Sequence, residues 1–382
     1  MTVVFDARCI DAKASGTGIY VRELLRRLPV LAPDWHWHVL FHDDAARRAV
    51  LADALPGGRP NVSAAILPYR FPSLFGKAKL VKLLIDIRCD LYFSPIVANS
   101  FLAMGGFLGA CKAAVVAVHS NPMRDTVNPF WAAMKRHCLV RAVSNCTALL
   151  VVSHALRDDI VRELSLSTRS AARLKVVYEG VSSAFTPSPP SPSAAGKARV
   201  ILYVGNQRRY KNIPTLIRAF AELRRRLPDL RLLLVGPESD NPLPLRNLIR
   251  DLGLAEHVIL AGETVERDLV AAYREAALLV SPSSYEGFSF PLLEAMACGT
   301  PVVCCEGGAV GELVGEAADP IPSGDAPALE VAMERMLTDA PFREKSIAAG
   351  LARAAGFSWD RTARETLAAF SDALAAKGGG AR

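Results

Sequence analysis

Two carboxylates with a strand-to-helix turn between them are the clearest sign of chemistry in this chain. Glu286 and Glu294 bound the stretch EGFSFPLLE, within the run SPSSYEGFSFPLLEAMACGTPVVCCEGG from Ser281 to Gly308. Apolar segments lie before this run and near its end, so the two acids stand between two expected strands. This arrangement favours a ligand-binding turn, and the alternative is an ordinary turn with two solvated acids.

The residues around the two acids predict a strand, a loop and a helix. The apolar run that ends at Val280 reads as a buried strand, which the following Ser-Pro-Ser-Ser sequence breaks. Ser289 is predicted to be the N-cap, Pro291 is tolerated in a first turn, and Gly299 suits the position just past the helix. Glu286 is therefore expected at the carboxyl end of a strand, where open α/β sheets bind ligands. The adjoining helix N-terminus suits phosphate or sugar oxygens.

The same run resembles the nucleotide-sugar-binding segment of retaining glycosyltransferases of the GT-B fold, in the large family 4. Pro291, the small residues 295–298 and the following Gly-Thr-Pro fall where that family has them. By family position, Glu294 would hold the ribose hydroxyls of the donor, and Glu286 would contact the transferred sugar as a catalytic residue. The neighbouring donor-binding residues that the resemblance implies are Gly287, Phe288 and Ser289.

The loop YVGNQRRYKN, after the strand that opens the C-terminal half, resembles the diphosphate-binding loop of that family. Lys211 matches the family lysine, whose point charge would neutralise the leaving nucleoside diphosphate. The family often has an arginine directly after the strand glycine or just before the lysine, where this chain has Asn206 and Tyr210. Arg208 or Arg209 is expected to supply the second charge, and the residues leave open which one does. A solvated loop is the alternative for both arginines.

Three residues of the N-terminal half complete the candidate site. Gly16 and Gly18 resemble the family's glycine loop, which lets backbone approach the donor phosphate. G-x-G alone is a weak signal, and Val21 stands where a dinucleotide fingerprint has its last glycine. His119 ends an apolar strand, where the family has a histidine that approaches the donor sugar, and it is a candidate catalytic residue. The aspartate that usually follows is replaced by Ser120, so any role of that carboxylate is lost.

No cofactor is expected, because the nucleoside-diphosphate sugar is a substrate. No metal is expected either, because no cluster of Asp, His or Cys has a spacing suited to a divalent ion, and Lys211 with helix N-termini can supply the positive charge. His36, His38 and His42 alternate along one strand, and an exposed strand face is favoured there over a metal site. The eight cysteines make no C-x-x-C spacing, which favours reduced thiols in a cytosolic protein. The start of the chain lacks the basic region of a secretory signal.

The chain is expected to form two domains, because 382 residues exceed one ordinary core. Strand-like and helix-like segments alternate in both halves, which predicts an α/β protein with parallel sheets. The resemblance makes this the GT-B architecture, with two Rossmann-like domains facing each other across a cleft. The expected parts are an acceptor-binding domain over 1–185, a Pro/Ser-rich linker over 186–198, a nucleotide-sugar-binding domain over 199–356, and a segment 357–382 whose helix returns to the N-terminal domain.

The N-terminal half carries the positive charge of the chain. Through Pro190 there are 23 Lys and Arg against 14 Asp and Glu, while the whole chain has a net charge of +7. Such a surplus favours an anionic partner, with a solvated surface as the alternative. The segment from Tyr69 to Ile85 interleaves aromatic and basic residues, which is typical of an interfacial helix. We therefore expect peripheral contact with the inner face of the cytoplasmic membrane, or a core helix behind an exposed loop.

The resemblance covers nearly the whole chain and implies a retaining transferase. It would move a hexose, with mannose favoured, from a nucleoside-diphosphate sugar to a saccharide acceptor on a lipid carrier, in bacterial surface-polysaccharide assembly. Donor base, sugar, acceptor, linkage and oligomeric state are left open. The alternatives are a catalytically silent sugar-nucleotide-binding protein and a GT-B nucleotide-sugar 2-epimerase. A nucleic-acid-binding protein would rest on the basic half alone, and no recognition motif supports it.

Overall fold

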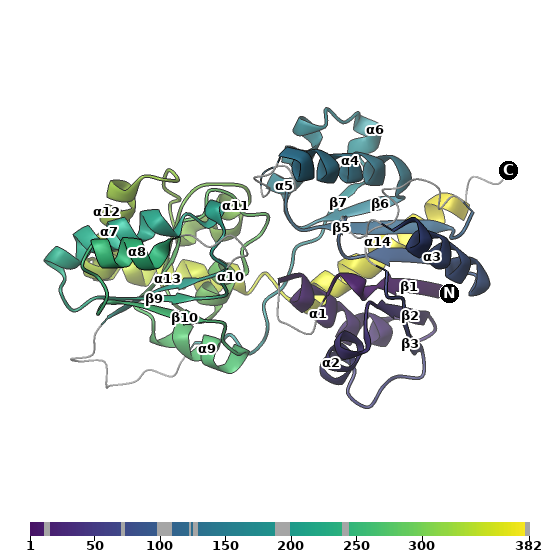
Figure 1. Cartoon of the computed structure of the whole chain (residues 1–382), viewed down its shortest axis with the longest axis horizontal. Helices are drawn as coiled ribbons and strands as arrows, with labels where there is room; N and C mark the ends of the chain where they lie inside the picture. The colour runs from purple at the N-terminus through teal and green to yellow at the C-terminus, as the bar shows by residue number, and fades with distance from the viewer. Residues whose placement is uncertain are drawn as a thin grey trace. The chain divides into compact units, whose positions relative to one another are not determined.

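The computed structural model describes residues 1–10, 16–69, 73–97, 109–121, 124, 129–187, 199–238 and 244–378. The chain forms two compact units (Figure 1). The first contains Met1–Gly180 together with Trp359–Arg382, and the second contains Val181–Ser358. The expected linker over 186–198 lies outside the described residues from 188 onward.

The first unit is a parallel sheet with helices packed on it. Within the described residues the strand order is β3-β2-β1-β4-β5-β6-β7. The strands are β1 (Thr2–Asp6), β2 (His36–Phe41), β3 (Val62–Ile66), β4 (Leu91–Ser94), β5 (Ala113–Val118), β6 (Ala148–Val151) and β7 (Leu174–Val176). The helices are α1 (Gly16–Leu31), α2 (Asp44–Ala54), α3 (Leu74–Asp86), α4 (Pro129–Asn145), α5 (His154–Glu163), α6 (Thr168–Ala171) and α14 (Trp359–Gly378).

The C-terminal helix α14 returns to the first unit, as predicted, and lies along α1 (Figure 1). Its buried aromatic side chains explain why it returns. The rings of Trp359 and Tyr20 lie 6.1 Å apart, and those of Phe370 and Phe93 lie 5.0 Å apart. Burying aromatic side chains of this size is among the larger favourable terms in folding. The helix is therefore part of the first unit's core.

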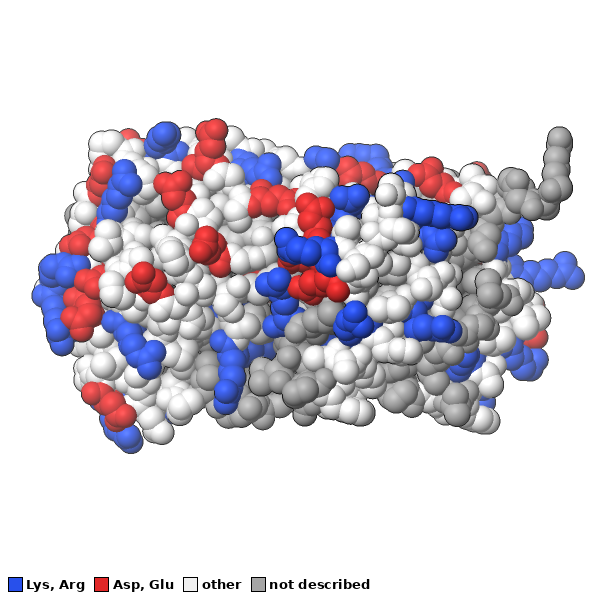
Figure 2. All heavy atoms as spheres, turned by 90° about the horizontal axis from the view of Figure 1, so that it is seen from above, with Lys and Arg blue, Asp and Glu red and all other residues white. Residues whose placement is uncertain are grey.

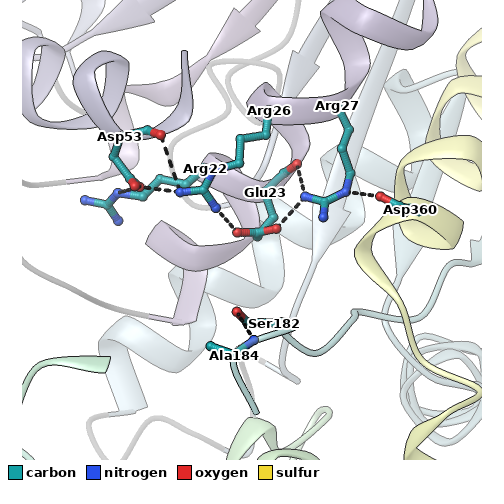
Figure 3. A network of polar contacts seen from close by, with 8 residues as sticks. All are labelled: Arg22, Glu23, Arg26, Arg27, Asp53, Ser182, Ala184 and Asp360. Atoms are coloured by element: carbon teal, nitrogen blue, oxygen red, sulfur yellow. Dashed lines mark hydrogen bonds and ion pairs between the residues drawn. The ribbon is translucent and has the colours of Figure 1, made fainter. Parts of the chain in front are cut away.

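Charged side chains join α1 to α2 and α14 at the surface of this unit (Figure 3). Glu23 of α1 accepts hydrogen bonds from Arg26 and Arg27. Arg26 also donates to Asp53 at 2.6 Å, and Arg27 donates to Asp360 at the start of α14. Exposed ion pairs contribute little individually, so this network orients the helices and the apolar contacts hold them.

The second unit has the same parallel architecture with fewer strands. Within the described residues its strand order is β10-β9-β8-β11-β12. The strands are β8 (Val200–Val204), β9 (Arg231–Val235), β10 (Val258–Gly262), β11 (Leu278–Ser281) and β12 (Val302–Cys304). The helices are α7 (Ile213–Arg226), α8 (Leu245–Asp251), α9 (Glu266–Glu275), α10 (Phe290–Ala297), α11 (Val310–Val314), α12 (Ala326–Thr338) and α13 (Ala340–Ala354).

Both sheets have a point at which the strand order reverses. In the second unit the chain proceeds from β8 outward through β9 and β10, and then returns to place β11 on the other side of β8. In the first unit the same reversal lies between β1 and β4. Loops that leave neighbouring strands in opposite directions open a crevice at such a point, where α/β proteins bind ligands. The loops after β8 and β11 therefore hold the candidate site of the second unit.

Candidate functional site

Lys211 and Glu286 meet at the reversal point of the second sheet. Lys211 ends a short turn after β8, Arg209–Lys211, and Glu286 lies in the loop after β11. Lys211 Nζ donates to Glu286 Oε1 at 2.6 Å, and each side chain is only 11% exposed. The sequence predicted both residues for the donor site, and the structure shows in addition that they form one buried ion pair.

The backbone around Glu286 is held by neighbouring loops. The Ser284 N–H donates to the Tyr210 carbonyl at 2.8 Å, which ties the loop after β11 to the loop after β8. On the other side, the Ala309 N–H donates to the Glu286 carbonyl at 2.8 Å. Gly308 has a φ of +59°, and a Cβ there would lie 2.1 Å from the Glu286 carbonyl oxygen. Only glycine therefore permits this approach, which fixes the position of the carboxylate.

Two opposing effects act on the pKa of Lys211. Burial lowers it, whereas the charges of Glu286 and Tyr210 raise it, and the resulting pKa lies above the ordinary lysine value. The side chain is therefore a permanent cation at neutral pH. Arg208, an exposed neighbour, lowers the Lys211 pKa through like-charge repulsion. Of the two arginines in this loop, Arg208 is thus the one whose charge acts at Lys211.

Ser289 stands at the N-cap position of α10, as predicted, but its side chain does not cap the helix. Its φ is +105°, an uncommon value for a residue with a side chain. The hydroxyl is buried and has no hydrogen-bond partner among the described residues, and the same is true of Ser283 Oγ. Strain and an unpaired buried donor are typical of ligand sites. Both hydroxyls are therefore candidate contacts for donor oxygens, and Ser283 was missed by sequence reasoning.

Phe288 and Gly287 complete this loop. Both are buried, and the Phe288 ring lies 5.9 Å from that of Phe290 and 5.8 Å from that of Phe357. These edge contacts anchor the turn on the apolar side. Phe288 therefore has a packing role that explains why an aromatic residue follows the glycine.

Glu294 lies in α10 and is only 6% exposed. Its Oε2 accepts a hydrogen bond from the Tyr273 hydroxyl at 2.7 Å. Burial raises the pKa of Glu294 to about 7, the Tyr273 hydrogen bond lowers it, and Glu266 raises it. The carboxyl group is therefore near its titration midpoint at neutral pH.

His119 lies at the carboxyl end of β5 in the first unit. Its Nδ1 is 2.8 Å from Glu179 Oε1, and its Nε2 is 2.7 Å from the Pro95 carbonyl oxygen. Its ring also contacts Tyr20 edge to face, at 4.6 Å between centroids. Both ring nitrogens are thus engaged, so a ring hydrogen bond to a sugar would replace one of these partners. Glu179 was missed by sequence reasoning, because only the fold brings it beside His119.

Gly16 and Gly18 lie in the first turn of α1, which begins earlier than its apolar pattern predicts. Gly16 is exposed and Gly18 is buried, and the loop before them, residues 11–15, lies outside the described residues.

No group of three or more His, Cys, Asp and Glu side chains in the described ranges is placed to hold a metal ion. All eight cysteines are thiols that form no disulfide, and six of them are buried. His38 contacts Ser63 on the neighbouring strand at 2.6 Å, on the outer part of the sheet. Among the helices described, none combines the length and apolar character needed to cross a bilayer.

The relatives known from sequence align with little more than half of this chain. It is 33% identical over 233 residues to the D-inositol 3-phosphate glycosyltransferase of Thermobifida fusca, which covers 57% of this chain and 54% of that protein. It is 30% identical over 243 residues to the O-antigen chain mannosyltransferase B of Escherichia coli, which covers 61% of this chain and 62% of that protein. The chain thus spans between half and two thirds of the length of these relatives.

Solved structures match over nearly the whole chain. A sucrose-phosphate synthase from Thermosynechococcus elongatus superposes with a TM-score of 0.78 at 21% identity, covering 98% of this chain and 99% of that chain. Anabaena HepE, in a complex with UDP and glucose, gives 0.77 at 19% identity, covering 97% and 100%. At this level of identity the likeness establishes the fold, which is the GT-B arrangement of two Rossmann-like domains.

A family model, that of the glycosyl transferases group 1, matches residues 186–353. This range contains Lys211, Glu286 and Glu294 and coincides closely with the second compact unit. The second unit is therefore similar to the domain that this family model describes.

Proposed function

We propose that this chain is a retaining glycosyltransferase that takes a hexose from a nucleoside-diphosphate sugar, with mannose as the favoured hexose. The observation that carries the proposal is the buried pair of Lys211 and Glu286 at the reversal point of the second sheet. Burying two charges is costly, so a fold retains such a pair where a site uses it. The matched family domain contains both residues.

Lys211 is proposed to stabilise the leaving group. As the bond between the sugar and the diphosphate stretches, negative charge collects on the diphosphate oxygens. A fixed cation in a site with little water stabilises that charge strongly. Arg208 adds a second positive charge, and the N-terminus of α10 adds a positive dipole end.

Glu286 and Glu294 are proposed to bind the two sugars of the donor. Glu286 would accept hydrogen bonds from the transferred hexose, and Glu294 from the ribose hydroxyls. The retaining course is proposed to be attack from the same face, with the leaving phosphate taking the acceptor's proton. For His119, the proposed contact with the donor sugar requires a sugar hydroxyl to replace the Pro95 carbonyl at Nε2.

The donor is proposed to be GDP-mannose, with a UDP-hexose as the alternative. The relative from Escherichia coli that is named as an O-antigen chain mannosyltransferase supports mannose. Anabaena HepE was solved with UDP and glucose, which supports a UDP-hexose. The acceptor is proposed to be a saccharide on a lipid carrier, and the reaction to take place at the inner face of the cytoplasmic membrane.

A contact between α3 and the membrane surface is proposed on the basis of the exposed side chains of that helix. Phe75 and Ile85 are 61% and 56% exposed, while Leu80 and Leu84 pack inward. Lys79 Nζ lies 4.9 Å from the Phe75 ring centroid, so charge and aromatic surface occur together. Basic side chains are also prominent on the face of the first unit seen from above (Figure 2).

A donor panel tests the activity. Unfolding temperatures are measured with GDP-mannose, GDP-fucose, UDP-glucose, UDP-galactose and UDP-N-acetylglucosamine, because a bound donor raises the unfolding temperature by mass action. Release of the nucleoside diphosphate is then measured with the best donor. We expect one donor to stabilise the protein and to be consumed.

The outcomes separate the alternatives. Stabilisation without turnover, with or without added saccharides, would indicate a silent sugar-nucleotide-binding protein. Conversion of the donor to its 2-epimer would indicate an epimerase. No stabilisation by any of the five donors would contradict the proposal. Glu286→Gln removes the charge proposed to contact the transferred hexose and should lower turnover. Its control is Glu344→Gln, on the exposed face of α13, which removes the same charge from the surface.

A further inference from the structure

Tyr273 is the one residue whose side chain hydrogen-bonds to Glu294 in the described part of the chain. It lies in α9, twenty-one positions before Glu294, and is fully buried. The 2.7 Å bond from its hydroxyl to Oε2 leaves the other carboxylate oxygen available to a second donor. A carboxylate with two oxygens can accept from both partners at once.

The surroundings hold Tyr273 at three places. The Thr300 hydroxyl donates to the Tyr273 backbone carbonyl at 2.6 Å. Its ring contacts Phe185 edge to face, at 5.7 Å between centroids. Its hydroxyl is bound to Glu294. A side chain fixed at its backbone, ring and tip has one orientation, and it transmits that orientation to the carboxylate.

We propose that Tyr273 is a positioning residue for nucleotide binding, which turns the Glu294 carboxylate so that its free oxygen meets the ribose hydroxyls of the donor. The inference rests on the proposed function, because it assigns an orientation to the residue that would bind the ribose. It extends the site to α9, which carries none of the residues expected from the sequence. Tyr273 acts through Glu294 and has no contact of its own with the nucleotide.

The groups around Glu294 influence the pKa of its carboxyl, so the contact with Tyr273 should affect the pH dependence of nucleotide binding. Besides Tyr273, the charged group that acts on this carboxyl is Glu266 of α9, and Glu294 in turn raises the pKa of Cys298 just after α10. The other titratable groups on elements packed against α10 are Arg267, Asp268, Arg274 and Glu275 of α9, Cys304 of β12, Glu312 of α11, and Arg343, Glu344, Lys345 and Arg353 of α13. The Arg353 guanidinium donates to the carbonyls of Glu312 and Leu313. The Tyr273 hydroxyl therefore remains the main group that favours the ionised carboxylate.

The experiment removes one hydroxyl from the protein and the matching hydroxyls from the ligand. Dissociation constants of GDP and UDP are measured by calorimetry for the wild-type chain and for Tyr273→Phe, from pH 5.5 to 8.5. The 2′,3′-dideoxy forms of the same nucleotides are measured in parallel. Tyr92→Phe is the matched control, since it removes another buried hydroxyl that donates to a carboxylate, Asp6, in the first unit.

We expect Tyr273→Phe to weaken binding of the better nucleotide about 3- to 10-fold at pH 8, which corresponds to one lost hydrogen bond. The pH at which binding is half lost should move upward, because the carboxylate loses the donor that favours its charged form. With the dideoxy nucleotide both effects should vanish. Tyr92→Phe should leave nucleotide binding and its pH dependence unchanged.

Two results with Tyr273→Phe would overturn the inference. A different result, with the wild-type chain, would contradict the proposed function. Equal binding and an equal pH profile in wild type and Tyr273→Phe would remove Tyr273 from the site. An equal loss for the ribose and dideoxy nucleotides would mean that Tyr273 supports the fold of the unit alone. If the wild-type chain bound neither GDP nor UDP, the proposed function itself would be wrong.

Discussion

The buried pair of Lys211 and Glu286 is expected to affect both activity and stability, which exposed side chains usually affect separately. Each charge is a candidate for substrate contact, and each is also the other's partner in a place with little water. Removing one member of a buried pair leaves an uncompensated charge and typically costs about 3–5 kcal/mol. Stability and activity therefore have to be measured together at this site.

The first prediction at the residue scale concerns Lys211. Lys211→Met should lower turnover about 10²–10³-fold, because it removes a charge directed at the leaving group. It should also destabilise the second unit, which denaturant unfolding will detect. Adding Glu286→Gln to this variant should restore much of the stability and none of the activity. Lys345→Met, on exposed α13, is the control, and wild-type turnover in Lys211→Met would exclude the assigned role.

A second prediction at this scale concerns the pH dependence that Glu294 gives to stability. The pKa of its carboxyl is about 7 in the folded chain against an ordinary value of 4.5. Between those values the folded state holds a proton that the unfolded state has lost, so this group lowers stability as pH rises from about 4.5 to about 7. Glu294→Gln should therefore stabilise the protein above pH 7, by up to about 3 kcal/mol, and leave it unchanged near pH 4.

Chemical unfolding at pH 4 and pH 8 tests this expectation. The same variant should bind the nucleotide more weakly at pH 8, so a gain in stability would accompany a loss of function. Glu344→Gln provides the comparison for an exposed acid of the same unit. A stabilisation of equal size at both pH values would contradict the explanation.

At the scale of elements, α14 completes the first unit rather than extending the second. Its Phe370 is fully buried and packs on Phe93 of β4. Phe370→Ala should cost about 3–5 kcal/mol, because it removes a large buried ring and leaves a cavity. Phe130→Ala, which alters an exposed ring of the same unit, should change stability by less than about 0.5 kcal/mol. Unfolding followed by tryptophan fluorescence and circular dichroism would measure both, and equal effects would contradict the packing argument.

Helix α3 carries the prediction about the membrane. Binding to vesicles should grow with the fraction of phosphatidylglycerol and fall with salt, since each exposed base near an anionic surface adds about 1 kcal/mol. Replacing Lys77, Lys79 and Lys82 by Glu should abolish flotation. The Lys82 ammonium already pairs with Asp86 at 2.8 Å, so its share should be the smallest of the three.

The control variant for flotation has the same change in net charge, but at residues of the second unit. Arg246, Arg250 and Arg267 are exposed on the second unit, and their replacement by Glu changes the net charge by the same amount. This variant should still bind the vesicles. Equal loss in both variants would show that net charge, and not α3, governs the attachment.

At the scale of the whole molecule, the two units repeat one architecture and differ in what their loops carry. The second unit brings a permanent cation to the point where its strand order reverses. We predict that transfer continues in EDTA, because Lys211, Arg208 and the N-terminus of α10 supply positive charge for the diphosphate. Rates measured with and without the chelator test this. Loss of activity that Mg²⁺ or Mn²⁺ restores would contradict it.

Much of the fold was predictable from local pattern. Buried parallel strands are continuously apolar, so the apolar runs of the sequence predict strands at Leu91–Ser94, Ala113–Val118 and Arg231–Val235, and the structure has strands with these bounds. Strand β3, at the edge of the sheet, was missed, because its five residues VSAAI include two alanines, which are depleted in strands, and four of the five are exposed. The apolar pattern predicts a helix over Ile19–Leu28, and these boundaries were wrong, since α1 starts at Gly16 and runs past Pro29 to Leu31.

The chain's sequence by itself determined which loops are candidates for the site and several of the charged residues they carry, and the tertiary structure decided which further residues join them and how they act on each other. Loops that follow strands can be recognised from turn residues, so Lys211, Glu286 and Glu294 were identifiable one by one. Their partners were not, because the contacts of Lys211 with Glu286, Glu294 with Tyr273 and His119 with Glu179 join segments 75, 21 and 60 positions apart. Such pairs arise only when the order of strands in each sheet places distant loops side by side, and burial then decides the charge that each group carries.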